Sequence, residues 1–176
     1  MMGDKNLIKI IDEALQCEEE TALEAGSLGY MARAMVQATM PYKDWKDPYY
    51  ERVNGTFKLT MMGLRDFGIP YGTYPRLFLN WITTEAVRTK NKTLLLGPSM
   101  SSFMDELGVQ HTGGKYGTNR AFRDRILRLL TCSVSCRWSS DSRDVGLGFN
   151  IARRYDLWWD PRRANESALW KSHITL

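Results

Sequence analysis

A cluster of arginines in the middle of the chain has the residue types and spacing of a nucleic-acid contact. Between positions 115 and 128 the chain carries five positive charges and one negative charge, Asp124. Arginine can read guanine edges with two hydrogen bonds and can clamp phosphates, so these residues are candidates for DNA contact. With two arginines of the following segment, the candidate DNA-binding residues are Lys115, Arg120, Arg123, Arg125, Arg128, Arg137 and Arg143.

These arginines lie on a stretch with the pattern of an amphipathic helix, for which Asn119 is the expected N-cap. The side chains expected to be buried are Phe122, Ile126, Leu129 and Leu130, and the arginines cover the other side. Asp124 stands four residues from both Arg120 and Arg128, so a solvated face with local ion pairs explains the charges equally well. The further arginines at 153, 154, 162 and 163 extend the positive charge and favour nucleic acid.

The glycines before this helix resemble a phosphate-binding loop only superficially. Gly113, Gly114 and Gly117 would let the backbone approach a phosphate closely. The Walker pattern fails, however, because Val109 stands where it needs glycine and Tyr116 where it needs Ser or Thr. No nucleophile elbow, histidine pair or metal-carboxylate cluster is visible in the sequence, so we expect no catalytic residue, metal or cofactor. The protein is expected not to be an enzyme.

The cysteines and the hydropathy pattern indicate a reducing, non-membrane environment. Cys17, Cys132 and Cys136 are odd in number and unsuitably spaced for a disulfide framework, so buried thiols are expected. No apolar run approaches the roughly 18 residues of a membrane span, and the N-terminus lacks the apolar core of a signal peptide. We therefore expect a cytoplasmic protein without a membrane partner.

The formal net charge of +4 is unevenly distributed. Residues 1–26 contain two basic and seven acidic side chains, a charge of −5, which leaves +9 on the remaining 150 residues. A basic body behind an acidic leader indicates a polyanionic partner, although an excess of Lys and Arg alone is a weak signal.

Periodicity and turn signals predict an α+β fold. A helix over Asn6–Ala25 is expected to end at Gly26, and Pro41 closes an ambiguous run over Tyr30–Met40 that we interpret as a strand. The remaining expected elements of the first half are a loop over Tyr42–Arg52, a turn at Asn54-Gly55, a strand over Thr56–Met61, a helix over Tyr74–Lys90 with Pro75 in its first turn, and a strand over Thr93–Leu96.

The second half has the order of a winged helix: helix, turn, helix and two-stranded ribbon. Ser99 is the expected cap of a first helix that ends at Gly108, and the arginine-rich helix follows a glycine-rich connection. Ser133–Ser139 and Val145–Tyr155 are the expected strands of the β-ribbon wing. Adjacent indoles cannot both point inward on a strand, so one of Trp158 and Trp159 is expected at the surface.

These segments resemble the plasmid-encoded RepA replication initiators of broad-host-range and Pseudomonas-type plasmids. The most specific string is IPYGTYPRLFLNWITTEAVRTK over Ile69–Lys90. The other matching strings are Gly29–Thr39 with Pro41, Arg52 with Asn54-Gly55, Leu59–Met62, Leu96-Gly97, Ser102–Met104, Leu107-Gly108, Thr112–Gly114 and the arginine-rich helix through Leu130. The resemblance covers about residues 28–176, so we expect an acidic leader over 1–27 and a winged-helix domain over 28–176.

The resemblance implies an initiator that binds repeated sequences (iterons) in double-stranded origin DNA, helps to open the duplex and recruits the host helicase and its loader. It also implies a homodimer that represses its own synthesis or limits copy number. Initiators of this kind carry two winged-helix domains, and Leu169–Leu176 looks like the strand that leads into the second. In the first domain, the basic residues would then hold phosphates beside a dimer surface instead of reading bases.

Two other functions are consistent with the residues alone. A winged-helix transcriptional repressor would place the arginine-rich helix in the major groove. A pure oligomerisation module would use the same arginines only to keep its surface solvated.

Overall fold

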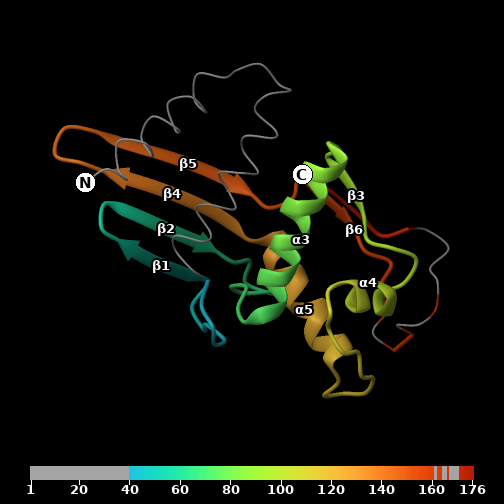
Figure 1. The fold of residues 1–176 in the computed structure, drawn as a ribbon. Helices are drawn as coiled ribbons and strands as arrows, with labels where there is room; N and C mark the ends of the chain where they lie inside the picture. Colours follow the sequence, from blue (N-terminus) through green and yellow to red (C-terminus); the bar gives the residue numbers. More distant parts are fainter. Residues whose placement is uncertain (1–39, 161, 164–165, 167–170) are drawn as a thin grey trace.

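A computed structural model describes residues 40–160, 162–163, 166 and 171–176 (Figure 1). The helix expected over Asn6–Ala25 lies outside the described residues, as does the strand expected over Tyr30–Met40 apart from its last residue. The described chain forms two antiparallel sheets, with three helices between and beside them.

The larger sheet has four strands in the order β1-β2-β4-β5. These strands are β1 (Tyr49–Asn54), β2 (Phe57–Met62), β4 (Ser133–Ser139) and β5 (Asp144–Asn150). The expected turn between these strands is confirmed but lies one residue later: Asn54 ends β1 and pairs with Phe57, and Gly55 in the turn has a φ of 59°. The loop expected over Tyr42–Arg52 is wrong in its second half, where β1 begins at Tyr49. Pairing with β2 and burial of Tyr50 outweigh the polar composition there.

The smaller sheet has three short strands in the order β3-β7-β6. These are β3 (Thr93–Leu95), β6 (Arg154–Asp156) and β7 (His173–Thr175). The single strand expected over Val145–Tyr155 is therefore wrong, because β5 ends at Asn150 and the chain passes through buried Ile151 and Ala152 into the other sheet. The last described strand, β7, is the central strand of this sheet.

Three helices complete the described fold: α3 (Thr73–Thr89), α4 (Met100–Glu106) and α5 (Thr118–Thr131). Pro75 lies in the first turn of α3 as expected, and the Ser99 hydroxyl accepts a hydrogen bond of 3.2 Å from the Ser102 backbone to cap α4. The cap expected at Asn119 is wrong. Gly117 is the N-cap of α5, and Asn119 is buried in the first turn because the connection folds back against the helix.

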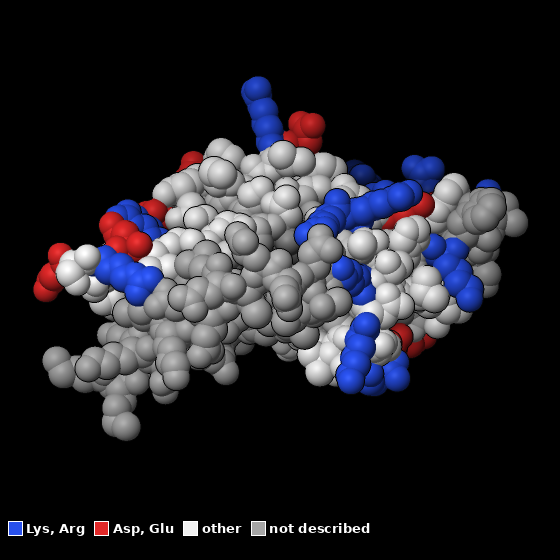
Figure 2. Space-filling view, turned by 90° about the horizontal axis from the view of Figure 1, so that it is seen from above, with Lys and Arg blue, Asp and Glu red and all other residues white. Residues whose placement is uncertain are grey.

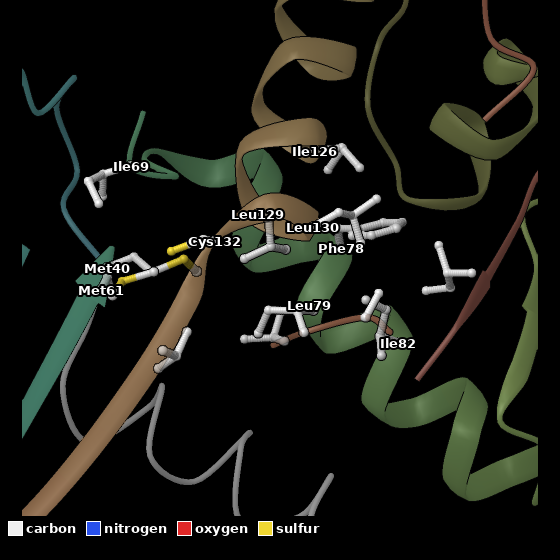
Figure 3. Packing of buried hydrophobic residues seen from close by; sticks show 14 of the residues in the cluster. Met40, Met61, Ile69, Phe78, Leu79, Ile82, Ile126, Leu129, Leu130 and Cys132 are labelled. Carbon is white, nitrogen blue, oxygen red and sulfur yellow. The ribbon is translucent and has the colours of Figure 1, made fainter. Parts of the chain in front are cut away.

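The core lies where α3 and α5 pack together beside the end of the larger sheet (Figure 3). In this view Phe78, Leu79 and Ile82 of α3 lie near Leu129 and Leu130 of α5. The α5 residues expected in the core, including Phe122 and Ile126, are all buried. Cys132 and Cys136 are buried free thiols as expected, and burial raises the pKa of each to about 12.

An aromatic cluster joins the three helices to the segment after β6. Phe103 of α4 lies with its ring centroid 4.8 Å from that of Trp81, 6.3 Å from that of Phe122 and 5.5 Å from that of Trp159. The two adjacent indoles separate as expected: Trp159 is 5% exposed within this cluster, whereas Trp158 is 51% exposed. The cluster orients the arginine face of α5, because Phe122 anchors the opposite face.

The α+β class is confirmed by this arrangement. The order helix, connection, helix and ribbon is present as α4, α5 and β4-β5. The ribbon is not an isolated wing, however, since β4 also pairs with β2 in the four-stranded sheet. None of the described helices has the length and apolar run that a membrane crossing requires.

Candidate nucleic-acid interface

The arginines of α5 lie on the face of the helix away from the core, but they differ in what they contact. Arg128 binds Asp44, with 2.9 Å between its Nη1 and the carboxylate Oδ1, and donates to the Ile69 carbonyl at 3.3 Å. Its guanidinium also lies 5.1 Å from the ring centroid of Tyr71. Arg128 thereby ties α5 to two segments that precede α3.

Arg125 is held in a similar way, one turn earlier on the helix. Its guanidinium lies 4.5 Å from the ring centroid of Tyr71 and 5.2 Å from that of Tyr74, within the range of cation–π attraction. Gly72 leaves room for it: a Cβ at this position would lie 3.1 Å from Nη1 of Arg125, and the glycine has a φ of 81° that other residues rarely adopt.

Asp44 is the acidic centre of these contacts. The ammonium of Lys46, 2.6 Å away, and the guanidinium of Arg128 hold the pKa of the Asp44 carboxyl below its ordinary value. The same segment is fastened to α3, because Arg76 donates to the carbonyls of Met40 and Gly72. We name the contacts among Asp44, Tyr71, Arg125 and Arg128 the arginine–tyrosine clasp.

The remaining basic residues of α5 and its connection are less engaged. Arg123 donates to the Trp159 carbonyl at 3.1 Å, whereas Arg120 in the first turn is exposed. Lys115 is exposed as well, with its ammonium 5.5 Å from the ring centroid of Tyr116, itself 92% exposed. Of the basic residues predicted on α5 and its connection, Lys115 and Arg120 are thus the most accessible to an external phosphate.

The two arginines predicted on the ribbon follow α5 in the chain, one on β4 and one in the turn after it. Arg137 of β4 is paired with Asp144 of β5, with 2.8 Å between Nη2 and Oδ2. Hydrogen bonding to Arg137 lowers the pKa of the Asp144 carboxyl. Arg143 lies in the turn between β4 and β5, where its carbonyl accepts from the Ser140 backbone at 2.8 Å. The ribbon therefore presents a charge pair beside an arginine at its tip.

The connection before α5 is closed by its own hydrogen bonds. The backbone of Thr112 donates to the Thr118 hydroxyl at 2.7 Å, and the backbone of Thr118 donates to the Thr112 hydroxyl at 3.0 Å. Gly117 is required by this closure, because a Cβ there would lie 2.2 Å from the Thr112 carbonyl oxygen. At Gly113, by contrast, a Cβ would meet nothing within 4 Å, which leaves this backbone open to a close approach.

Sequence reasoning missed the arginine–tyrosine clasp. Its signal is the string of two glycines and two tyrosines over Gly68–Arg76, whose bare backbone and rings accept two guanidinium groups from α5. Among the described residues, no three His, Cys, Asp or Glu side chains gather as a metal-binding group.

Comparison with known proteins places the chain in a family. Residues 69–176, more than half of the chain, match the family described as plasmid-encoded RepA protein. The chain belongs to the family of plasmid-encoded RepA proteins. The match confirms the resemblance inferred from the sequence, and it begins at the string that contains Tyr71 of the clasp and leads into α3. No curated protein sequence matches the chain.

The fold is similar to solved structures of domains 2 and 3 of RctB. One of them, described as RctB domains 2-3, has a TM-score of 0.52 at 12% identity and covers 81% of this chain and 55% of that one. A second, from selenomethionine derivatives of the same domains, has a TM-score of 0.50 at 12% identity, with coverages of 70% and 47%. The RepA chain spans about half the length of these structures, and at this identity the likeness concerns the fold alone.

Proposed function

We propose that this RepA chain acts in the initiation of plasmid replication by binding double-stranded origin DNA in the cytoplasm, without catalysing a reaction. Membership of the plasmid-encoded RepA family carries the proposal. The charge of +9 on residues 27–176 supports it, because an excess of this size favours a polyanionic partner.

Within this function we infer that α4, α5 and the β4-β5 ribbon act as a winged-helix unit with α5 towards DNA. The accessible cations of this unit are Lys115, Arg120 and Arg143, supplemented by Arg123 and Arg137. Because Arg125 and Arg128 are engaged in the clasp, this surface suits phosphate contacts better than base reading. The iteron repeats would then be read mainly by a part of the initiator other than this surface.

Homodimerisation is the second part of the proposal. Among the described strands β1 lies at the edge of the larger sheet, and exposed apolar side chains lie along it: Tyr49 and Val53 of β1 and Met62 of β2. Apolar groups on an edge strand favour pairing with another chain. Light scattering over a range of concentrations is expected to show a dimer, and Val53→Glu should weaken it. A strictly monomeric protein at the highest concentration would contradict this part.

DNA binding is tested by fluorescence anisotropy with labelled origin repeats and with unrelated duplex of equal length. We expect the logarithm of the association constant to fall linearly with the logarithm of the salt concentration. The slope should steepen by about 0.9 for each phosphate contact. Arg120→Ala and Lys115→Ala should each make the salt slope less steep. If the two side chains touch only phosphates, the loss of affinity should be the same on the origin repeats and on the unrelated duplex. Binding that is absent at low salt would refute the proposal.

A pure oligomerisation module is the second candidate. The internal contacts of Arg123, Arg125 and Arg128 favour it, because these arginines then serve packing and not a partner. It predicts a stable dimer that has no affinity for DNA.

A further inference from the structure

The end of the smaller sheet carries a second basic surface that the arginine-rich helix does not reach. Lys90 and Lys92 flank the turn from α3 into β3, Arg154 begins β6, and Arg153 directly precedes it. All four side chains are exposed. Figure 2 shows Lys and Arg gathered over the part of the molecule where the end of α3 and the smaller sheet lie in Figure 1. We name these four residues the small-sheet basic surface.

Strand pairing brings the two halves of this surface together across some sixty residues of chain. The backbone of Arg153 donates to the Thr175 carbonyl at 2.8 Å, and the backbone of Leu176 donates to the Lys92 carbonyl at 3.1 Å. Thr93 and Arg154 lie in register on either side of Thr175, with the two threonine hydroxyls 3.4 Å apart. Strands lie about 4.8 Å apart, so the outer two are about 10 Å apart, which corresponds to about three base-pair steps along the axis of a duplex.

The positive charges at this end come from two segments that are far apart in the sequence. Cations near the end of a helix interact well with its dipole, which accounts for Arg88 and Lys90. Arg88 is in addition paired with Glu85 at 2.6 Å. Arg153 and Arg154 come from the segment that enters β6, which β7 separates from β3, so the fold adds their charges to this end from a distant part of the chain.

The backbone of Lys90 is a second and independent observation. It is the one non-glycine residue with positive φ among the described residues, at 53°, and it occupies the C-cap of α3. Glycine is the usual residue in this left-handed cap because it has no Cβ to strain. The chain carries a lysine where a glycine would relieve strain; its ammonium group is favoured by the helix dipole at this end and is exposed to an external anion.

We propose that the small-sheet basic surface binds the phosphate backbone of duplex DNA, as a site separate from the α5 surface. The inference rests on the proposed DNA-binding function and adds a second place where the duplex touches the protein. In Figure 1 the smaller sheet and the end of α3 lie at the opposite end of α3 from the connection into α5, so the two surfaces are well separated. Since it is built from flexible cations and two threonine hydroxyls, this site would hold phosphates without regard to sequence.

The first test measures the salt dependence of duplex binding for Arg153→Ala/Arg154→Ala. Loss of two phosphate contacts should lower the slope by about 1.8, which corresponds to binding about 60-fold weaker at 0.1 M salt if the variants converge at 1 M. The control, Lys43→Ala/Arg65→Ala, removes the same charge from exposed positions outside both surfaces and should keep the wild-type slope. Near-ultraviolet circular dichroism checks that both variants are folded.

The second test separates stability from binding at one residue. Lys90→Gly should raise the thermal unfolding midpoint by a few degrees, because it relieves the left-handed cap, and yet lower the salt slope by about 0.9. A purely structural lysine would show the rise without the loss of affinity, and that result would overturn the inference.

The remaining outcomes distinguish the inference from the function on which it rests. If wild-type protein binds duplex and Arg153→Ala/Arg154→Ala keeps the wild-type dependence of affinity on salt, the second site is refuted and the proposed function stands. If wild-type protein binds no DNA at low salt, both are refuted. If the variant loses affinity only for single-stranded DNA of the same length, the assignment to duplex is wrong.

Discussion

Replacing Arg128 by leucine tests the arginine–tyrosine clasp most directly. The change keeps the aliphatic stem over the core but removes the ion pair to Asp44, the hydrogen bond to the Ile69 carbonyl and the cation–π contact with Tyr71. We expect unfolding to become easier and the connection before α3 to lose its attachment to α5.

The magnitude follows from the three contacts. A charge-assisted hydrogen bond between half-buried groups contributes about 1–2 kcal/mol after allowance for solvent screening. The bond to a neutral carbonyl adds about 1 kcal/mol and the cation–π contact about 0.5 kcal/mol. Because contacts of one side chain are not additive, we expect a loss of about 2–3 kcal/mol, equivalent to a fall of about 4–12 °C in Tm for a chain of this size.

Urea unfolding followed by tryptophan fluorescence measures this loss, and Arg120→Leu is the matched control on the exposed part of the same helix. The control should change the free energy of unfolding by no more than about 0.5 kcal/mol. A double-mutant cycle with Asp44→Asn should give a coupling energy of at least 0.5 kcal/mol, as expected for residues in contact. If Arg128→Leu costs no more than Arg120→Leu, the clasp does not stabilise the fold.

Three further predictions concern the connection, the carboxylates and the thiols. Gly117→Ala should destabilise the protein by about 1–3 kcal/mol, because its Cβ would lie 2.2 Å from the Thr112 carbonyl oxygen, whereas Gly113→Ala should be nearly neutral in the same urea titration. Cations lower the pKa of Asp44 and Asp144, so the stability that they contribute is complete well above the ordinary value of 3.8 and is lost as the pH falls below it. Asp44→Asn should therefore flatten the acid limb of a stability–pH curve, and an unchanged limb would contradict the pairing. In a Cys17→Ser variant, Cys132 and Cys136 should resist a thiol reagent at pH 8 until urea is added, because burial raises the pKa of each thiol to about 12; rapid labelling of the native protein would show that one of them is accessible.

Local patterns in the sequence were sufficient for the longer elements. The 3.6-residue period of α3 and α5 and the alternation in β2 and β4 matched the structure closely, since each depends on one face buried along a continuous segment. The smaller sheet has no such pattern, because strands of three residues are too short to show alternation and acquire meaning only when they pair.

The sequence predicted which residue types make up the candidate site, but not which of their side chains are free to contact a partner. The charge and spacing of α5 located the arginines correctly on one face. Whether Arg125 and Arg128 point to a partner or to Tyr71 depends on a segment more than fifty residues away, and helical periodicity contains no information about that distance. The same limit concealed the alignment of Thr93 and Arg154 on either side of Thr175 in β7.

The position of β7 has a consequence for how the protein folds. Neither β3 nor β6 pairs with the other, so both depend on β7, and the contact between Thr93 and Thr175 spans 82 residues. Closing a loop of this length is entropically costly and slow compared with forming the β1-β2 or β4-β5 hairpins. The smaller sheet should therefore assemble late. During synthesis β3 cannot pair until β7 has been made. Until then the protein has its helices and hairpins but lacks the paired end where its two groups of cations meet.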